Sequence, residues 1–478
     1  MKIEKIMEET IMKINQVYST VNSIAKQMWG ENAITAVDAR DIISMGKTVL
    51  SSETERDNFL SILADRIGTT ILRTLDLELD FPNLLRHSYE WGAIISKINI
   101  QPFEAKQQKA WLVGADGFTP NQFDIDKPTV TQTFFKDANA FEFDVTIPDT
   151  MLKTAFISAE EFGAFVDGIM ASISDSMVMA LNNMSYVAID NFIAEKLKAG
   201  NGVVNPLVGY NAQAGTSYTS LTEALDDKEF YRYLGMTIRN IIKYMAKPSK
   251  LYNTGNMVRA TARDNMHVIL SSDVVSGYTT YLSADTFHDE LVALPGYAEF
   301  VTLQATGVSG IPTIAGNTQI NVIPASNADN DNTAVTAKGI IGIICDREAI
   351  GIGYDDMFNA TDRNNRNRYT NYTYGCTRQW FNDLSENGVV LIANTDGISV
   401  DKSTLTFANS SASTQAITAT TSPAGQTVTW KSSNTAVATV SSGTVTPVGA
   451  GTCTITASAT IDGVTYKAVT TVTVGASE

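Results

Sequence analysis

The sequence predicts an α+β protein that ends in an all-β sandwich. Three observations indicate this order. A helical pattern of about 40 residues begins at Ser158, β-rich segments lie on both sides of it, and a Ser/Thr-rich stretch of short strands follows Thr395. At ~100–200 residues per domain, the 478 residues predict two to four folding units.

The composition is that of a globular protein with an excess of acidic groups. Hydrophobic residues make up 44% and charged residues 18%, and the net charge is −16. Bulk electrostatics therefore does not favour nucleic-acid binding, which needs clustered Lys and Arg. No apolar run approaches the ~18 residues of a membrane span, and the N-terminus lacks the apolar core of a signal peptide.

The N-terminal region is expected to be helical. Apolar residues recur at gaps of three and four between Ile3 and Met28, which places them on one face of a helix. This helix is either an arm that docks on a partner or neighbouring subunit, or a helix packed on its own core. The sequence favours neither of these two interpretations over the other. A second helix is predicted over 53–75.

Residues 98–147 are predicted to form a long β-excursion. The segment is rich in aromatic and β-branched residues, and "FEFDVTI" at 141–147 alternates as a half-exposed strand does. The tip, "GADGFTPNQ", is made of turn-forming residues. Such an excursion buries little surface against itself, so we expect it to lean on another molecule.

The helix predicted from Ser158 to Ala199 is the strongest local signal. Ser158 and Glu161 form a capping box, and Gly200 follows the last turn as a C-cap. Apolar residues keep helical spacing in between. At 1.5 Å per residue, about 40 residues span ~60 Å, which suggests a spar along a flat molecule.

The next part of the chain is predicted to be mixed α+β. A loop or short hairpin is expected over 201–220, and a polar, mobile loop over 325–336. Helices are expected over 222–246 and 279–294. A buried strand is predicted at 266–272 and a core strand at 388–394, and further strands at 299–303, 319–325 and within 339–354.

A change of composition at about Thr395 marks a predicted domain boundary. From Asp396 onward the chain has three Lys, no Arg and four acidic residues, while Ser and Thr dominate. Seven or so short strands in about eighty residues argue for a β-sandwich, with Trp430 as a core residue. These strands are predicted at 403–407, 414–422, 427–433, 437–443, 444–449, 451–460 and 466–474.

Residue types that carry catalysis or bind metals are sparse and scattered. The histidines are His87, His267 and His288, and no HExxH, GxSxG, P-loop or GxGxxG motif occurs. A lone histidine in such a segment is more often structural. We therefore name no catalytic, cofactor-binding or metal site, and we expect no cofactor and no enzymatic activity.

The cysteines and one arginine-rich segment each have a structural interpretation. Three cysteines, which cannot all pair within the chain, indicate folding in a reducing compartment. Over 362–383 several arginines alternate with aromatics, a pattern that binders of single-stranded nucleic acid also show. We favour a strand whose arginines pair with acidic neighbours, because the whole chain is acidic. The residues are Cys345, Cys376 and Cys453, and Arg363, Arg366, Arg368 and Arg378.

The order of these elements resembles the major capsid proteins of tailed bacteriophages, which have the HK-97 fold. "VTIPDTMLKTAFISAEEFGAFVDGIMASI" is similar to the return of that family's E-loop into its spine helix. "GIIGIICDREAIGIGYDD" resembles the strand pair between its A-domain and P-domain, and "RQWFNDLSENGVVLI" its last P-domain strand. The resemblance covers about residues 30–394.

The C-terminal stretch resembles a bacterial Ig-like group 2 domain through Trp430, "SSNTAVATV" and "VGAGTCTITA". Together with "NFLSILADRIGTTILRT", this combination is most similar to the capsid proteins of phi-29-like short-tailed phages. The resemblance implies an N-terminal helical arm at 1–60, a shell domain at 61–394 and an Ig-like domain at 395–478. Within the shell domain it implies an E-loop at about 98–147, a spine helix at about 158–199 and an A-domain at about 221–350.

This resemblance implies a major capsid protein that self-assembles into the icosahedral or prolate head shell of a tailed phage. The implied partners are further copies in pentamers and hexamers, a separate scaffolding protein, the portal protein at one vertex and packaged double-stranded DNA. The DNA is expected to be held without sequence-specific binding. Head fibres or host glycans are further partners expected of the Ig-like domain.

The implied location is the virion, after assembly in the host bacterial cytoplasm and without membrane contact. The Ig-like domain is expected on the outside of the shell, where it braces neighbouring subunits or touches host glycans. A mildly acidic inner wall that keeps DNA from sticking is a hypothesis, and a strongly basic inner face would contradict it.

Three other functions compete with this one. The first is a surface adhesin or carbohydrate-binding protein, against which the missing export signal and the single Ig-like copy weigh. The second is a phage baseplate or tail protein, which the spar helix disfavours. An enzyme is the most distant, because the expected motifs are absent.

Overall fold

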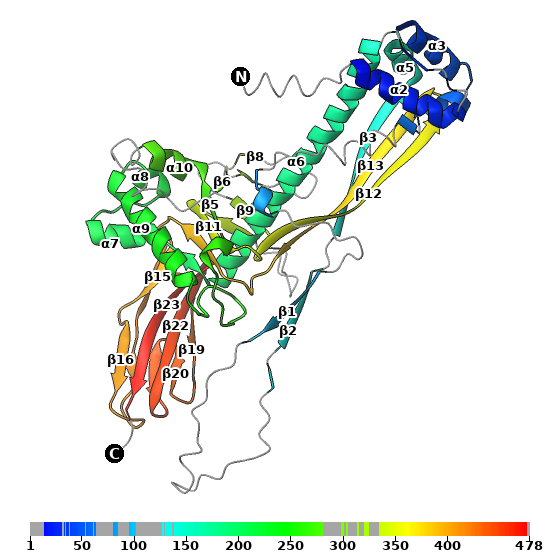
Figure 1. Ribbon diagram of the computed structural model, residues 1–478. Coiled ribbons are helices and arrows are strands. Elements are labelled where there is room, and N and C mark those ends of the chain that lie inside the picture. Colours follow the sequence, from blue (N-terminus) through cyan, green and yellow to red (C-terminus); the bar gives the residue numbers. More distant parts are fainter. Residues whose placement is uncertain are drawn as a thin grey trace.

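Helix α6 (Ala159–Ala199) is the axis of the molecule (Figure 1). With strands β12 (Ile350–Asn364) and β13 (Tyr369–Asn382), it joins a helical cluster at one end to a five-stranded sheet at the other. The computed structural model describes residues 14–30, 33, 35–37, 39–52, 54–60, 62–63, 80–84, 95–101, 127–128, 130–135, 138–157, 159–280, 298–300, 303–304, 313–314, 320–324 and 334–475.

Helix α6 has 41 residues, as its apolar spacing predicts. Residues 183–197 are buried on every side, whereas the N-terminal half buries one stripe that includes Phe162 and Met177. Gly200 has a φ of +63° and donates its N–H to the Lys196 carbonyl at 2.9 Å, which confirms the predicted C-cap. Ser158, the predicted N-cap, lies outside the described residues.

The length and composition of α6 between Glu161 and Ala199 also match those of a membrane-crossing helix, which the sequence analysis did not anticipate. A core helix passes the same test. The apolar stretch that meets this criterion is 25% buried, whereas the C-terminal half of α6, with Asp190, Glu195 and Lys196, is buried within the protein.

Three long strands run beside α6 in the order β12-β13-β3, with β3 at Ala138–Pro148. Side chains of β3 alternate between buried or half-buried and exposed from Phe141 onward, as the sequence pattern predicts. Phe141 and Ile147 point inward and join the cores that α6 also lines. The segment predicted as one β-excursion over 98–147 therefore divides, because its last strand pairs with β13.

Four helical segments surround the N-terminal half of α6: α2 (Ile14–Trp29), α3 (Ala39–Val49), residues 54–60 and α5 (Asp149–Ala155). Val21, Ile24 and Phe59 are fully buried and share a core with Phe162. Helix α2 thus packs on the chain's own core, the second of the two interpretations of its apolar stripe. Most of the helix predicted over 53–75 lies outside the described residues.

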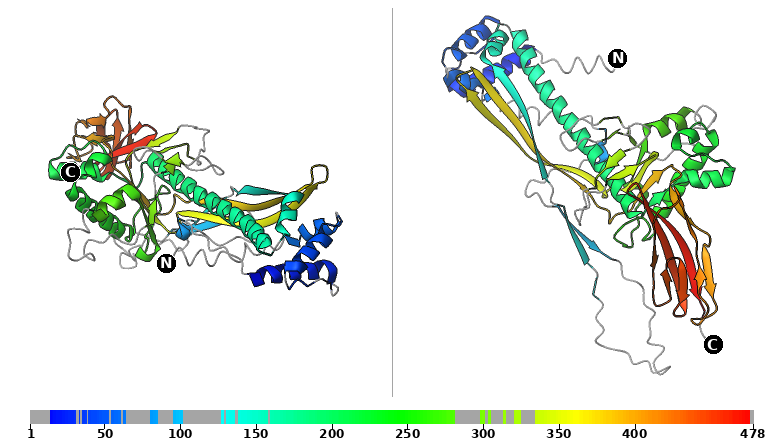
Figure 2. Two further views of the ribbon diagram at one scale, coloured as in Figure 1. Left: turned by 90° about the horizontal axis from the view of Figure 1, so that it is seen from above. Right: turned by 180° about the vertical axis from the view of Figure 1, so that it is seen from behind.

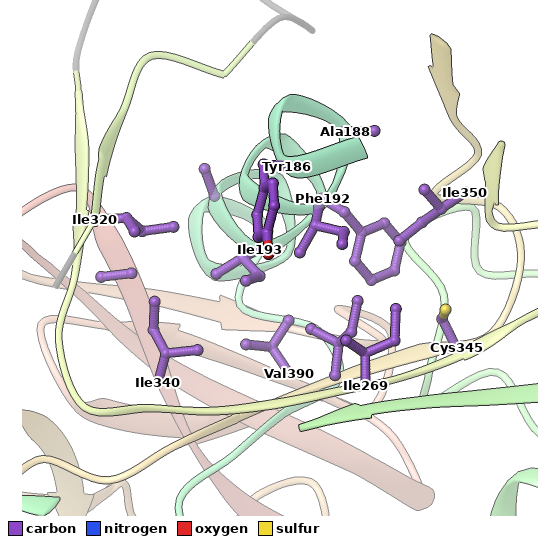
Figure 3. Close-up of a cluster of buried hydrophobic side chains, with 14 of the residues drawn as sticks. Tyr186, Ala188, Phe192, Ile193, Ile269, Ile320, Ile340, Cys345, Ile350 and Val390 are labelled. Carbon is purple, nitrogen blue, oxygen red and sulfur yellow. The ribbon is translucent and has the colours of Figure 1, made fainter. Parts of the chain in front are cut away.

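The five-stranded sheet has the order β4-β14-β11-β5-β6. Helix α6 covers one face of it, where Phe192 and Ile193 lie over Ile269 and Val390 (Figure 3). Helices α7 to α10 cover the other face. The strands are β4 (Val203–Val204), β14 (Gly388–Ile392), β11 (Ile340–Asp346), β5 (Met266–Ser271) and β6 (Ala298–Phe300). The helices are α7 (Pro206–Ala214), α8 (Leu221–Ala224), α9 (Lys228–Met245) and α10 (Ser272–Tyr278).

The loop or hairpin expected over 201–220 is wrong, because it contains helix α7. Asn205 accepts the N–H groups of Leu207 and Val208 and so caps the helix, which begins at Pro206. Both residue types also occur in turns, so the segment reads as a loop from composition alone.

The single helix expected over 222–246 is also wrong, because it divides into α8 and α9. Asp227 accepts the N–H of Glu229 and caps α9. Its carboxylate also accepts hydrogen bonds from the hydroxyls of Tyr210 and Tyr218. In a continuous helix the same side chain would lie in solvent, whereas here these hydrogen bonds hold it.

Short strands complete the shell part of the chain. The buried strands predicted at 266–272 and 388–394 are confirmed as β5 and β14. The predicted loop over 325–336 ends in β10, which pairs with β9, while 325–333 and most of the helix predicted over 279–294 lie outside the described residues. These elements are η2 (Pro82–Leu84), η4 (Arg263–Asn265), β7 (Leu303–Gln304), β8 (Thr313–Ile314), β9 (Ile320–Val322) and β10 (Val335–Ala337).

The C-terminal strands enclose a core of their own that includes Phe407, Val445, Ile455 and Val472. Its sheets have the orders β16-β23-β22-β19, β17-β21-β20 and β15-β18. Trp430 is only partly buried against this core, which corrects its prediction as a core residue. The strands are β15 (Gly397–Val400), β16 (Thr404–Phe407), β17 (Gln415–Ala416), β18 (Ala419–Ser422), β19 (Val428–Ser432), β20 (Ala438–Ser441), β21 (Thr444–Pro447), β22 (Gly451–Ile461) and β23 (Val464–Val474).

The turn between β22 and β23 docks these strands on the end of α6. Lys467 donates from Nζ to the Ala199 carbonyl and to Asn201 Oδ1, both at 2.6 Å. A cation at this point complements the negative end of the helix. Asp462 forms an ion pair with Lys338 at 2.6 Å, and Val464 enters the core beneath α6.

Candidate functional site

The hairpin of β1 (Ile95–Ile100) and β2 (Val130–Phe135) projects from the molecule (Figure 1). One of its faces exposes apolar side chains to solvent. The side chains of Ile98, Ile100, Val130 and Phe134 are 60%, 62%, 53% and 60% exposed. Their register places them on one side of the hairpin, since Ile100 pairs with Val130. We call these four residues the apolar hairpin face. Contiguous exposed apolar surface of this kind is typical of a protein–protein interface.

The opposite face of the hairpin is fixed to the chain's own shell. Asn99 is 4% exposed and donates to Ser385 Oγ at 3.2 Å. Phe135 packs on Phe381 with 5.1 Å between ring centroids. The contacts of Asn99 and Phe135 therefore fix the orientation of the hairpin on the shell part of the chain. The apolar hairpin face points away from these contacts.

Lys97 is the electrostatic centre of this attachment. Its Nζ lies 2.7 Å from Glu386, 3.0 Å from Asp383 and 3.3 Å from Glu348. Burial disfavours the charged ammonium, but hydrogen bonds to and charges on Glu386 and Asp383 outweigh it and raise the pKa of Lys97 above 10.5. The ion pairs thus join β1 to the turn after β13, about 290 residues later in the chain.

A second buried lysine has a structural role. Lys196 on α6 is fully buried and donates to the Tyr252 carbonyl at 2.8 Å. Desolvation lowers its pKa to about 8, although Cys345, Asp383 and Glu195 oppose the change. Such a shift can mark a functional group. Here the ammonium is enclosed by core residues and ties α6 to the loop after α9.

The residues singled out for chemistry do not come together. His267 is half-buried on β5 opposite Cys345, whereas His87 and His288 lie outside the described part of the chain. Cys345 and Cys453 are buried, and neither forms a disulfide. Within the described ranges, no three His, Cys, Asp or Glu side chains form a group that could hold a metal ion.

The arginine-rich segment forms the hairpin of β12 and β13, as its alternation predicts. Arg363 contacts Asp57 at 3.2 Å and Asp149 at 3.3 Å, so the predicted pairing with acidic neighbours is confirmed for this residue. Arg366 and Arg368 are exposed at the turn. The side chain of Arg378 is outside the described ones.

One feature that the sequence analysis missed is a run of cations along α9 and the segment after it. From Phe230 to Arg263 there are seven Lys or Arg and no Asp or Glu. An average stretch of that length in this chain would carry roughly three or four acidic residues. The signal was present in the sequence, but the net charge of the whole chain concealed it.

Comparison with known proteins identifies relatives of one kind. The family model described as "Phi29-like phage major capsid protein" matches residues 21–392. The major capsid protein of Bacillus phage PZA is 22% identical over 282 residues, covering 59% of this chain and 58% of that protein. That of Bacillus phage B103 is 25% identical over 207 residues, covering 43% and 45%. The chain spans about half the length of these curated relatives.

Solved structures with a similar course of the chain also come from phages. The capsid structure of Staphylococcus phage Andhra has 10% identity and a TM-score of 0.44, covering 66% of this chain and 84% of that one. A chain in the structure of the head fiber and inner core protein gp22 of bacteriophage P68 has 10% identity and a TM-score of 0.43, covering 66% and 85%.

Proposed function

The chain belongs to the family of Phi29-like phage major capsid proteins, and we propose from this premise that it is the subunit that builds the head shell of a tailed phage. The chain is a structural protein and not an enzyme, and its place is the capsid of the virion. The family match gives no support to the alternative of a surface adhesin.

The observation that carries this proposal is the apolar hairpin face. Exposing these side chains costs an isolated subunit about 25 cal/mol for each Å² of apolar area, which a neighbour recovers by covering them. The inner face of the hairpin is already attached through Lys97, Asn99 and Phe135, so the outer face is presented at a set angle. A subunit that covers its neighbour's hairpin and offers its own makes a head-to-tail contact, which forms a ring when the rotation between neighbours closes.

The finer architecture that we propose is that of the HK-97 type. Residues 1–60 are the N-terminal arm and 61–394 the shell domain, with α6 as the spine helix. The β1–β2 hairpin belongs to the E-loop, about 98–147, and α9 to the A-domain, about 221–350. The long reach of α6, β12 and β13 supports this assignment, because a subunit that tiles a thin shell needs an extended, flat frame.

For residues 395–478 we propose a bacterial Ig-like group 2 domain on the outside of the shell. The separate core and the docking of Lys467 and Asp462 on the shell part support a rigidly held decoration. It either braces neighbouring subunits or touches host glycans weakly in many copies. In shells built with residues 396–478 deleted, fragility indicates bracing, whereas intact shells that no longer adsorb indicate glycan contact.

The other partners that we propose are the components with which a tailed-phage head is built and filled. Pentamers and hexamers of this chain assemble in the host bacterial cytoplasm with a separate scaffolding protein and a portal protein at one vertex. The finished shell encloses double-stranded DNA without reading its sequence. Cys345 and Cys453 are buried and form no disulfide, which is compatible with a reducing compartment.

Expression with the neighbouring phage genes, followed by negative-stain microscopy, tests the proposal. Closed shells are expected from the natural chain, and persistent monomers under all conditions would contradict the function. The combined variant Ile98→Thr, Ile100→Thr and Val130→Thr keeps β-branched residues but removes apolar surface, so we expect few or no shells. The matched control is Val448→Thr with Val469→Thr, two residues of the C-terminal β-domain that are each 49% exposed, and it should assemble normally.

A further inference from the structure

The cationic residues of α9 and the segment after it form one exposed stripe. Arg232, Arg239 and Lys243 follow one another at helical spacing, and Lys247 and Lys250 extend the row beyond the end of the helix. All except the half-buried Arg239 are exposed. We call these five residues the basic stripe. The opposite side of α9 is the apolar one, because Phe230, Leu234 and Ile238 fill the core against the five-stranded sheet.

The position of the stripe is set by that sheet. Helix α9 covers one face, and α6 covers the other. The β22–β23 turn is on the α6 side, because Val464 packs in the same core as Phe192. The C-terminal strands and the helices α7 to α10 both lie at the end of the molecule away from α2 and α3 (Figure 2). Within that end, the stripe belongs to the α9 side of the sheet and the β22–β23 turn to the α6 side.

We propose that the basic stripe is a contact surface for the phosphate backbone of double-stranded DNA on the inner side of the shell. This inference rests on the proposed function, and on the outward placement of the C-terminal domain proposed with it. If that domain is outside, α9 is turned toward the enclosed genome. The hypothesis of a mildly acidic inner wall and this proposal make opposite predictions for that face.

The chemistry favours DNA over a second protein surface. Lys is depleted at protein–protein interfaces, whereas Lys and Arg clustered on one helix face are the electrostatic footprint of a nucleic-acid binder. Arg232 pairs with the exposed Glu229 at 2.7 Å, a surface ion pair that phosphate contact can replace. Met236 and Tyr244 lie between the cations and are exposed. These two side chains would also suit a contact with an acidic protein.

Such a contact would be weak in one subunit and strong in the shell. Each phosphate contact adds about 0.9 to the slope of log affinity against log salt, and contacts to phosphates read no sequence. A few contacts in each subunit, repeated across the shell, hold DNA through effective concentration without any tight single site. The acidic remainder of the chain keeps the affinity of one subunit low.

The first test measures binding of the full-length chain to a random-sequence duplex of about 30 base pairs, by fluorescence anisotropy between 50 and 200 mM salt. The variant Lys243→Gln, Lys247→Gln and Lys250→Gln should bind about tenfold or more weakly, with a salt slope smaller by about 2 to 3. The matched control, Lys127→Gln, Lys153→Gln and Lys431→Gln, changes net charge equally at exposed sites and should bind as the natural chain does. Equal binding by both variants would overturn the proposal.

The second test separates failure of this inference from failure of the proposed function. Amine acetylation followed by mass spectrometry is compared between DNA-filled heads and the same heads emptied of DNA. We expect Lys243, Lys247 and Lys250 to be protected only in filled heads, with Lys431 unchanged. Protection of these lysines in both filled and emptied heads would indicate a protein interface. Reactivity in both kinds of head would show that the stripe is exposed to solvent. Either result overturns the DNA contact. Heads that lack this chain would instead contradict the shell function.

Discussion

The β1–β2 hairpin and the C-terminal β-domain are both β-structure, yet they treat their apolar side chains in opposite ways. Ile100 and Phe134 of the hairpin are 62% and 60% exposed, whereas Phe407 and Val472 are 1% and 0% exposed. Two strands cannot enclose a core, but facing sheets can. The C-terminal strands are therefore stabilised by their own core. The hairpin is stabilised by its contacts with the shell part of the chain, and we expect a neighbouring subunit to cover its apolar face.

The largest expected effect breaks the C-terminal side of this comparison. Phe407→Ala removes a buried ring from the core that these strands enclose, so we expect a loss of about 3–5 kcal/mol in their free energy of unfolding. Urea denaturation followed by intrinsic fluorescence measures it. Val448→Ala, at a half-exposed site, should cost less than about 0.5 kcal/mol. Equal losses would mean that the strands are not a self-supporting unit.

The next effect concerns the attachment of the hairpin. Lys97→Met leaves Asp383, which is 3% exposed, without its cation, so we expect the hairpin to loosen by about 2–4 kcal/mol. Hydrogen exchange at the amides of β1 reports this opening. The control is Lys338→Met, which breaks the exposed pair with Asp462 and should cost below about 1 kcal/mol.

The same pair of variants has an expected pH dependence. The pKa of Lys97 is raised in the folded chain, so its contribution is fully present below the unfolded value of 10.5 and is lost as pH rises through the folded value. The difference between the natural chain and Lys97→Met should stay constant from neutral pH to about 10 and shrink above it. A difference that already disappears near pH 8 would contradict the ion-pair account.

A smaller effect tests the docking of the C-terminal domain. Gly463 has a φ of +81°, and an added Cβ would lie 2.5 Å from the Ala334 carbonyl; Gly425 has a φ of +86° with open space around it. Both Ala substitutions strain the backbone by about 1–2 kcal/mol. Only Gly463→Ala should cost more than that and speed hydrogen exchange at the Thr336 amide, which bonds to Asp462. Equal behaviour would mean that the docking contact is not tight.

The smallest expected change in stability belongs to the apolar hairpin face. Ile98→Thr with Ile100→Thr should alter the free energy of unfolding of the monomer by less than about 0.5 kcal/mol, because both side chains are already in solvent. Shell assembly by the same variant should nevertheless fall sharply. A loss of monomer stability comparable to that of Phe407→Ala would show that the face is covered within the subunit.

Much of the fold was predictable because it depends on local periodicity. The spacing of apolar residues around Phe192 indicates a long helix, and the alternation from Phe141 indicates a half-exposed strand. Predictions were wrong where a side chain binds a group that is distant in sequence or packs in an unexpected way. Asp227 caps α9 while two tyrosines hold its carboxylate, and Trp430 is only partly buried against a core that other residues fill.

The candidate surfaces were less predictable than the fold. The sequence indicates that residues 98–147 need a partner, but it cannot say which of their apolar residues face outward. That follows from Lys97 and Asn99, whose partners near Asp383 and Ser385 select the inner side of the hairpin. The run of Lys and Arg after Phe230 can be recognised in the sequence. Its exposure cannot, because it depends on α9 burying its apolar face against the sheet.

By itself, the sequence determined the kinds of element, their order and the family to which their pattern is similar, because propensity, spacing and turn chemistry act over a few neighbouring residues. Tertiary structure alone decided that β3 joins β13, that the C-terminal strands dock on α6 through Lys467, and that the basic stripe and the β22–β23 turn lie on opposite sides of one sheet. The physical reason is that these contacts join residues far apart in the chain. Their free energy depends on burial and pairing in three dimensions, which no local pattern encodes.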